Sequence, residues 1–205
     1  MRLVTVAHGT RHAPGNTVAR TLTARAAARL DLPWVASFVE LAAPLYSALD
    51  QRPSVVVPLL LSTGHHVRHD LGGLRPLGPD PLLAAAQVAR LLEAGAEPGQ
   101  PVAMVAAGSR DPLAMRDLMV ATAYLSAAWG GPVRLATLGG LGRRPADVVR
   151  PGDAVSPYLL APGHFADRCR ESGGLVAGVI GTHATVVELV VRRAREQLAG
   201  RQRTA

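Results

Sequence analysis

The stretch that decides the fold reads VVVPLLLSTGHHVRHD and runs from Val55 to Asp70. It opens with an apolar, β-branched run of strand length, which stops at Ser62-Thr63-Gly64. Three of the seven histidines of the chain follow at once. In α/β proteins, ligands bind at the carboxyl ends of buried parallel strands. The stretch therefore predicts a buried strand whose end carries a functional site.

Strands and helices are predicted to alternate on both sides of this stretch. In the first part of the chain we expect strands at 2–7, 34–39 and 54–61 and helices at 14–30, 44–51 and 81–93. A linker is predicted at 95–101, followed by strands at 102–107, 133–138 and 154–161 and helices at 111–129 and 182–198. Alternation at these lengths is typical of βαβ units that form a parallel sheet.

The chain repeats itself with an offset of 99 residues, as from position 8 to position 107. At this offset HGTR (8–11) matches AGSR (107–110), PLLL (58–61) matches PYLL (157–160), and GHH (64–66) matches GHF (163–165). Three matches in one register indicate a tandem duplication. We therefore expect an α/β fold made of two tandem-duplicated, doubly wound parallel-sheet subdomains, residues 1–97 and 101–200, with a cleft between them.

The two copies differ at the residues that could carry chemistry. His8 has become Ala107 in the second copy, and His66 has become Phe165, whereas the glycines beside them are kept. The first copy is therefore interpreted as the working one. The second is interpreted as a structural copy that still frames the ligand.

His8 and His66 are predicted to meet although they lie far apart in sequence. In a doubly wound sheet of order 2-1-3 the first and third strands are neighbours, and their carboxyl ends form the ligand-binding crevice. Two neutral imidazoles with open coordination positions suit Fe, Co, Ni or Zn that is handled transiently. Glu40 ends the second strand and is either an ordinary exposed acid, a metal ligand or a residue that supports a ligand. His65 and His69 are either solvated loop residues or residues that pass metal to His66.

Composition limits the partners and the compartment. The net charge is +7 and all 22 basic residues are Arg, which favours anionic partners. The basic residues are scattered and aromatics are few, so we expect a small anionic ligand and no nucleic acid. The single Cys169 excludes an internal disulfide and a thiolate metal cluster. No apolar run approaches the ~20 residues of a membrane span, and no signal-peptide layout opens the chain. A cytoplasmic protein without a membrane partner is expected.

Taken together, the motifs of the first copy resemble those of the class II tetrapyrrole chelatases of the CbiX/SirB type. HGTR (8–11) is similar to the HGSR start of that family, ELAAP (40–44) to its E-x-x-x-P segment, residues 58–71 to its P-x-F-L-x-x-G-x-H-x-x-x-D-I motif, and GPDP (78–81) to its GP-x-P. The likeness covers the first copy and extends through the repeat to the second, as in the long, two-domain members. Thr10, Leu60 and His65 depart from the pattern without removing a needed chemical group.

This resemblance implies a lyase that inserts Fe²⁺ or Co²⁺ into sirohydrochlorin, giving a precursor of sirohaem or cobalamin. His8 matches a metal ligand that also accepts protons, and a neutral imidazole is a suitable base for the pyrrole N–H groups. His66 matches the second metal histidine. The expected substrate-binding residues are Arg11, Glu40, Leu61, Ser62, Thr63, Gly64, His65 and Arg68. A divalent metal (Fe²⁺, Co²⁺ or Ni²⁺) is expected as substrate, with no organic cofactor. The expected partner is an anionic tetrapyrrole, bound by a monomer or homodimer.

Two other classes remain as alternatives at this point. A non-catalytic carrier of metal or tetrapyrrole would use His65, His66 and His69 as a storage site. Histidine phosphatases also place His-Gly after the first strand, but their chemistry needs an Arg directly before the histidine, where this chain has Ala7.

Overall fold

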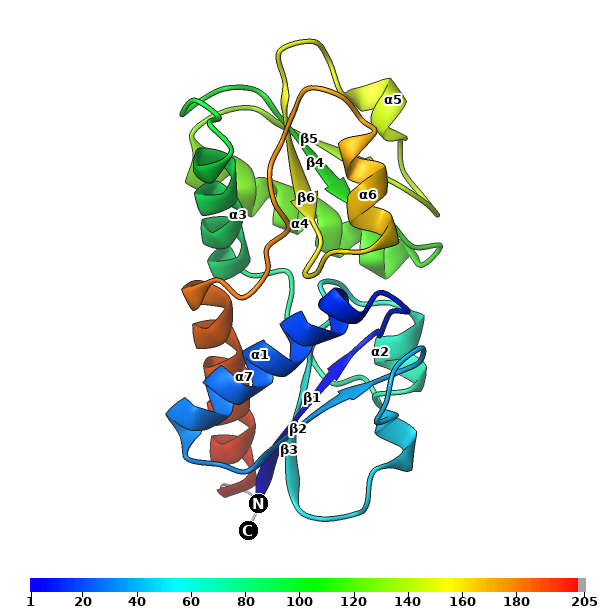
Figure 1. Cartoon of the computed structure of the whole chain (residues 1–205), viewed down its shortest axis with the longest axis vertical. Helices are drawn as coiled ribbons and strands as arrows, with labels where there is room; N and C mark the ends of the chain where they lie inside the picture. The colour runs from blue at the N-terminus through cyan, green and yellow to red at the C-terminus, as the bar shows by residue number, and fades with distance from the viewer. Residues whose placement is uncertain (203–205) are drawn as a thin grey trace.

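Two parallel sheets form the framework of the molecule (Figure 1). The computed structural model describes residues 1–202, apart from the side chains of His65, Arg201 and Gln202. The first sheet has the order β2-β1-β3 and the second the order β5-β4-β6-β7. The strands are β1 (Arg2–Ala7), β2 (Trp34–Phe38), β3 (Ser54–Pro58), β4 (Val102–Ala106), β5 (Val133–Thr137), β6 (Ala154–Tyr158) and β7 (Leu175–Val176). The predicted α/β fold with two parallel-sheet units is confirmed, while the cleft between them stays a prediction.

Seven α-helices are present among the described residues. They are α1 (Ala13–Leu30), α2 (His65–His69), α3 (Pro81–Glu93), α4 (Pro112–Trp129), α5 (Pro145–Val148), α6 (His164–Arg170) and α7 (Ala184–Gln202). The helix expected at 44–51 is only a 3₁₀ turn, Tyr46–Ala48. The strand expected to reach residue 61 pairs only as far as Pro58, because its neighbour β1 ends at Ala7. Residues 59–64 are therefore a loop that leads directly into α2.

Burial explains why the strands read as continuous apolar runs. β4 and β6 are buried at every position, and β1 is buried at its four central residues. Strands of a parallel sheet are covered on both faces, so their sequences lack polar alternation. In the first sheet β1 lies in the middle, paired with β2 from Leu3–Trp34 onward and with β3 from Arg2–Ser54 onward. The predicted strand order 2-1-3 is what the structure shows.

The two halves exchange one helix each. Helix α3 comes from the first half of the chain but packs against α4 and β6 of the second sheet. Helix α7 comes from the second half but packs against α1 and β3 of the first sheet (Figure 1). The predicted subdomains 1–97 and 101–200 therefore match the two copies of the sequence repeat. In the packed structure, however, each sheet is covered by one helix from the other subdomain. Periodicity shows which face of a helix is apolar, but not which sheet that face covers.

A buried ion pair holds the point where the chain crosses to α3. Asp80 is the N-cap of α3, and its Oδ1 atom accepts a hydrogen bond from the backbone N–H of Leu82 at 3.0 Å. Its Oδ2 atom accepts from Arg193 of α7 at 3.0 Å and also pairs with Arg192. The side chains of Asp80 and Arg193 are both 4% exposed. Removing one member would leave the other charge buried, which is costly.

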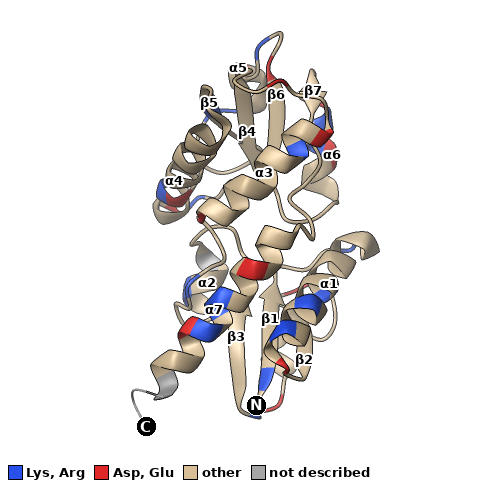
Figure 2. Cartoon of the chain, turned by 90° about the vertical axis from the view of Figure 1, so that its left-hand side faces the viewer, with Lys and Arg blue, Asp and Glu red and all other residues tan. Residues whose placement is uncertain are grey.

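Charged residues are spread over the helices and form no single basic face in Figure 2. Basic residues lie on α1, α4, α6 and α7, and acidic residues accompany them on α4, α6 and α7. Part of this charge joins the exchanged helix to its new neighbour, as in the pair of Arg29 with Glu188 at 2.7 Å. Within residues 1–202, no helix has the length and apolar character that a membrane crossing requires.

Candidate metal site

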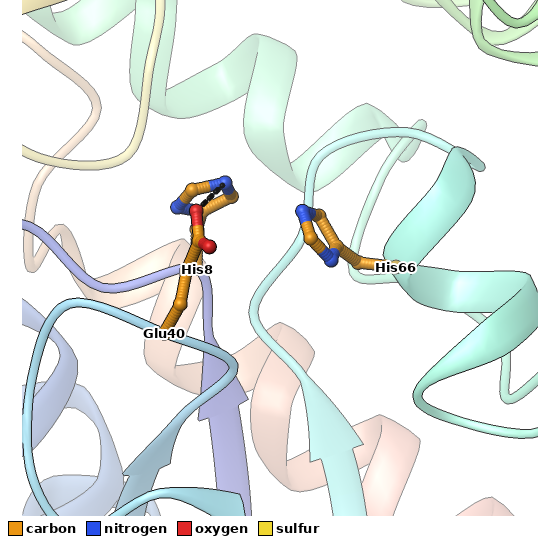
Figure 3. Close-up of side chains that lie close together, drawn as sticks. All are labelled: His8, Glu40 and His66. Atoms are coloured by element: carbon orange, nitrogen blue, oxygen red, sulfur yellow. Dashed lines mark ion pairs between the residues drawn. The ribbon is translucent and has the colours of Figure 1, made fainter.

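Three potential metal ligands meet at the carboxyl edge of the first sheet: His8, Glu40 and His66 (Figure 3). His8 follows β1, Glu40 lies in the loop after β2, and His66 lies in α2, the helix that follows β3. One ligand atom from each of them lies within 4.8 Å of the other two. The 2-1-3 strand order brings these residues together, because the ends of three neighbouring strands share one edge.

His8 is oriented by contacts at both of its ring nitrogens. Its Nδ1 atom lies 3.2 Å from the carbonyl oxygen of Gly9, so Nδ1–H donates and the lone pair lies on Nε2. Nε2 lies 3.3 Å from Glu40 Oε1. Both side chains are about half exposed, at 48% and 49%. The lone pair of His8 and the carboxylate of Glu40 therefore lie side by side at a position that solvent can reach.

Gly9 allows the ends of β1 and β2 to lie this close. Its φ is +95°, and a Cβ added there would lie 1.8 Å from the carbonyl oxygen of Glu40. The backbone N–H of Glu40 also donates to the carbonyl of His8 at 3.0 Å. A side chain at position 9 would push the two ligand-bearing loops apart, so glycine is required there.

His66 is oriented by the carboxylate of the residue that caps its helix. Its Nδ1 atom lies 2.7 Å from Oδ2 of Asp70, the C-cap of α2, four residues later in the chain. Nδ1–H donates to Asp70, which leaves the coordinating lone pair on Nε2. The His66 and His8 rings lie 4.9 Å apart between centroids, at 87° to each other. Asp70 was not among the predicted site residues, although its spacing of four from His66 is a readable signal.

The donor set suits a divalent first-row metal. Ligand atoms about 2.1 Å from a metal, at tetrahedral or octahedral angles, lie about 3.0–3.4 Å apart. The His8 and Glu40 atoms already have this spacing at 3.3 Å, whereas the three ligand atoms together lie within 4.8 Å, so His66 has to move closer to join them. Two imidazoles and one carboxylate leave further coordination positions for water or substrate. The arrangement can hold a metal ion without enclosing it.

The remaining predicted substrate-binding residues lie around this cluster, with different neighbours. Arg11 is exposed three residues after His8 in the chain, and residues 61–64 form the half-buried loop before α2. Arg68 forms an ion pair with Asp111 of the second half at 2.6 Å, which commits its guanidinium to that contact. The side chain of His65 lies outside the described part of the structure.

The second half keeps the backbone of this site without its ligands. A Cβ at Gly108 would lie 2.0 Å from the carbonyl of Gly139, just as one at Gly9 would strike Glu40. Gly139 therefore takes the place of Glu40, at the same offset of 99 residues as Ala107 and Phe165. Asp70 has likewise become Cys169, a buried thiol whose pKa burial raises to about 11. All three ligands and the supporting acid are replaced.

Comparison with known families agrees with the position of the cluster. Residues 2–94 match the family model of CbiX. This matched segment is referred to as the CbiX unit. The CbiX unit contains all three ligand residues and Asp70, and it ends directly after α3.

Solved structures share the fold along nearly the whole chain. SirB from Bacillus subtilis with Fe³⁺ superposes with a TM-score of 0.77 at 21% identity, covering 98% of this chain and 98% of that one. CbiX, described as the terminal enzyme for biosynthesis of siroheme in denitrifying bacteria, gives 0.71 at 18% identity, covering 96% and 99%. A multi-domain protein from Deinococcus radiodurans gives 0.71 at 17% identity, covering 96% of this chain and 55% of that one. No curated protein matches the chain.

Proposed function

We propose that the protein is a metal chelatase that inserts Fe²⁺ or Co²⁺ into sirohydrochlorin, giving a precursor of sirohaem or cobalamin. The observation that carries the proposal is the convergence of His8, Glu40 and His66 in the CbiX unit. The Fe³⁺ in the similar SirB structure and the siroheme pathway of the similar CbiX enzyme support the same reading.

The metal ion is a substrate in this reaction, and the site has to bind it without trapping it. Nε2 of His8, a carboxylate oxygen of Glu40 and Nε2 of His66 form the binding set. Because His8 and Glu40 are about half exposed, hydrated metal can reach them from solvent. Three ligands without a closed protein shell let the macrocycle nitrogens replace the protein donors one at a time.

Insertion also removes two protons, since the divalent metal replaces the two inner N–H hydrogens of the macrocycle. The lone pair of His8 Nε2 cannot hold metal and proton at once. When the metal moves to the macrocycle, this lone pair becomes available and His8 accepts a proton. Glu40 Oε1 lies 3.3 Å away and receives the second proton or passes one to solvent. Metal departure and proton acceptance are thus coupled at one nitrogen atom.

The substrate is a polycarboxylate, and the surroundings of the cluster suit it. Arg11 is exposed three residues after His8 and can form charge-assisted hydrogen bonds to a substrate carboxylate. Residues 61–64 supply the wall on the His66 side, with Leu61 as its apolar member. Arg68 contributes less than the sequence suggested, because Asp111 already neutralises it.

The direct test follows the absorbance of sirohydrochlorin with Co²⁺, Fe²⁺ and Ni²⁺ for the wild type and for His8→Ala, Glu40→Gln and His66→Ala. We expect each variant to lose at least tenfold in insertion rate, with His8→Ala the most affected because it removes ligand and base together. His164→Ala, an exposed histidine on the equivalent helix of the second half, is the matched control and should keep full activity. Full activity in His8→Ala would refute the proposal. Stoichiometric metal binding without turnover in the wild type would indicate the carrier function instead.

A further inference from the structure

The loop that carries His66 is held by the second half of the molecule. Three polar contacts join residues 61–68 to elements beyond the CbiX unit. The backbone N–H of Thr63 donates to Asp117 Oδ2 of α4 at 2.6 Å, and Tyr158 Oη of β6 donates to the carbonyl of Leu61 at 3.1 Å. Arg68 Nη2 lies 2.6 Å from Asp111 Oδ2. These contacts lie on both sides of His66 along the chain.

The helix that carries His66 needs outside support, because α2 has only five residues. A helix this short is not stable by itself in water. Val67 is buried within α2, and Leu71, just after it, packs with Val4 and Val6 of β1. The loop before α2 is anchored on the first half by Leu59 and Leu61 in the main core. Its contacts at Leu61 and Thr63 with Tyr158 and Asp117 add a second anchor on the second half.

The three contacts with the second half are strong or buried enough to fix the position of residues 61–68. A backbone N–H donating to a carboxylate is a charge-assisted hydrogen bond, about twice as strong as a neutral one. The Asp111 side chain is only 8% exposed, and its Oδ2 atom has Arg68 as its ion-pair partner. Its other oxygen accepts from the N–H of Leu113 and caps α4, which ties the pair to a rigid helix. Burial raises the pKa of Tyr158, with the Asp117 and Asp80 charges adding to it, so the phenol remains a donor.

The internal repeat supplies a comparison within the same molecule. At the offset of 99 residues, Asp117 corresponds to Val18, Asp111 to His12, and Thr63 to Pro162. Val18 offers no side-chain acceptor, and Pro162 has no N–H to donate. His12 makes no side-chain capping bond to α1. Both members of the Thr63–Asp117 contact are thus missing around the loop that has lost its histidine.

From this asymmetry we infer that Asp117 and Asp111 are positioning residues for the metal site. They hold the loop of residues 61–68 so that His66 faces His8 and Glu40. The second half has lost its own ligands and instead supplies the contacts that position the site of the first half. The inference rests on the proposed function only in taking His8, Glu40 and His66 as metal ligands.

The experiment compares Asp117→Ala, Asp117→Asn, Asp111→Asn and Arg68→Gln with the wild type. Co²⁺ is the probe, without tetrapyrrole, and the readouts are its dissociation constant and its visible absorption spectrum. Asp117→Asn keeps an acceptor for Thr63, and Asp111→Asn keeps the helix cap. The matched control is Asp167→Ala, an exposed acid on α6 at the position equivalent to Arg68.

We expect Asp117→Ala to weaken Co²⁺ binding about fivefold or more and to alter the spectrum, with Asp117→Asn restoring most of both. Arg68→Gln and Asp111→Asn should each weaken binding, and the double variant should be no worse than the stronger single one. Asp167→Ala should match the wild type. Unchanged Co²⁺ affinity and spectrum in folded Asp117→Ala and Arg68→Gln would overturn the inference. If Asp117→Ala fails to fold, the partly exposed Arg68→Gln decides alone.

The experiments distinguish failure of this inference from failure of the proposed function. Wild-type protein that binds Co²⁺ at the cluster but inserts none into sirohydrochlorin would refute the chelatase proposal and leave the inference standing. Normal insertion together with unchanged Co²⁺ binding in Asp117→Ala would refute the inference alone.

Discussion

At the scale of single residues, the site depends on which nitrogen of each imidazole holds the proton. The carbonyl of Gly9 determines this for His8, and the carboxylate of Asp70 determines it for His66. In both rings the lone pair is placed on Nε2, the atom available to a metal. Such hydrogen bonds to the far side of a ligand ring commonly change metal affinity as much as tenfold or more.

Replacing Asp70 tests this at His66. Asp70→Ala removes the acceptor from Nδ1, so the ring can rotate and change tautomer, and we expect Co²⁺ affinity to fall about 10- to 100-fold. Asp70→Asn keeps an acceptor oxygen and should lose less. Calorimetric titration with Co²⁺ measures both, and the exposed acid Asp167→Ala is again the control. Equal affinity of Asp70→Ala and the wild type would show that the contact with His66 is incidental.

Sequence reasoning reached the histidines but only part of their surroundings. His8 and His66 stood out because their counterparts in the repeat are Ala107 and Phe165. Glu40 was left open, although its counterpart at the offset of 99 residues is Gly139, and the matching backbone contacts of Gly9 and Gly108 confirm that correspondence. The pairing of Arg68 with Asp111 depends on how the two halves dock. Local motifs carry no information about that docking.

At the scale of elements, the strand order 2-1-3 was predicted as that of a doubly wound sheet, and the structure has it, whereas the partner of each helix was not predicted. Apolar residues in α3 and α7 predict a buried face for both helices. Each could cover either sheet as far as its periodicity is concerned. The structure places Asp80 of the crossing segment against Arg193 of α7, and this buried pair locks the exchanged arrangement.

The locking pair gives a prediction about stability. Asp80→Asn keeps an N-cap acceptor for α3 but leaves Arg193 buried beside a neutral amide, and we expect a loss of about 3 kcal/mol in the free energy of unfolding. Urea denaturation followed by circular dichroism measures it. The control is Glu188→Gln, which breaks the half-exposed pair with Arg29 and should cost less than about 1 kcal/mol. Similar losses in the two variants would argue against a special role for the buried pair.

At the scale of the whole molecule, the two halves are interdependent although their sequences repeat. The first sheet is covered by α1 and α7, and the second by α4 and α3. The predicted boundaries at residues 97 and 101 would cut each sheet off from one of its covering helices. Sequence similarity between the halves indicates where the chain duplicated, and the packing shows what has to stay together.

Cutting the chain at the repeat boundary tests this interdependence. Residues 1–97 contain every proposed metal ligand but lack α7, so the apolar surface of β3 and α1 is exposed to water. We expect this fragment to show no cooperative unfolding as a monomer and no tight Co²⁺ binding. Adding residues 101–205 in trans should restore both. Light scattering, urea denaturation and Co²⁺ titration are the measurements, and a stable, metal-binding monomer of 1–97 would contradict the packing argument.

The exchange of helices also sets an order in time. During synthesis the three strands that precede His8, Glu40 and His66 emerge well before α7, the helix that covers them. Before α7 has docked, the nascent chain contains these residues, but the first sheet lacks one of its covering helices. We therefore expect the proposed metal site to form only after α7 has docked, so that partly made chains bind metal weakly.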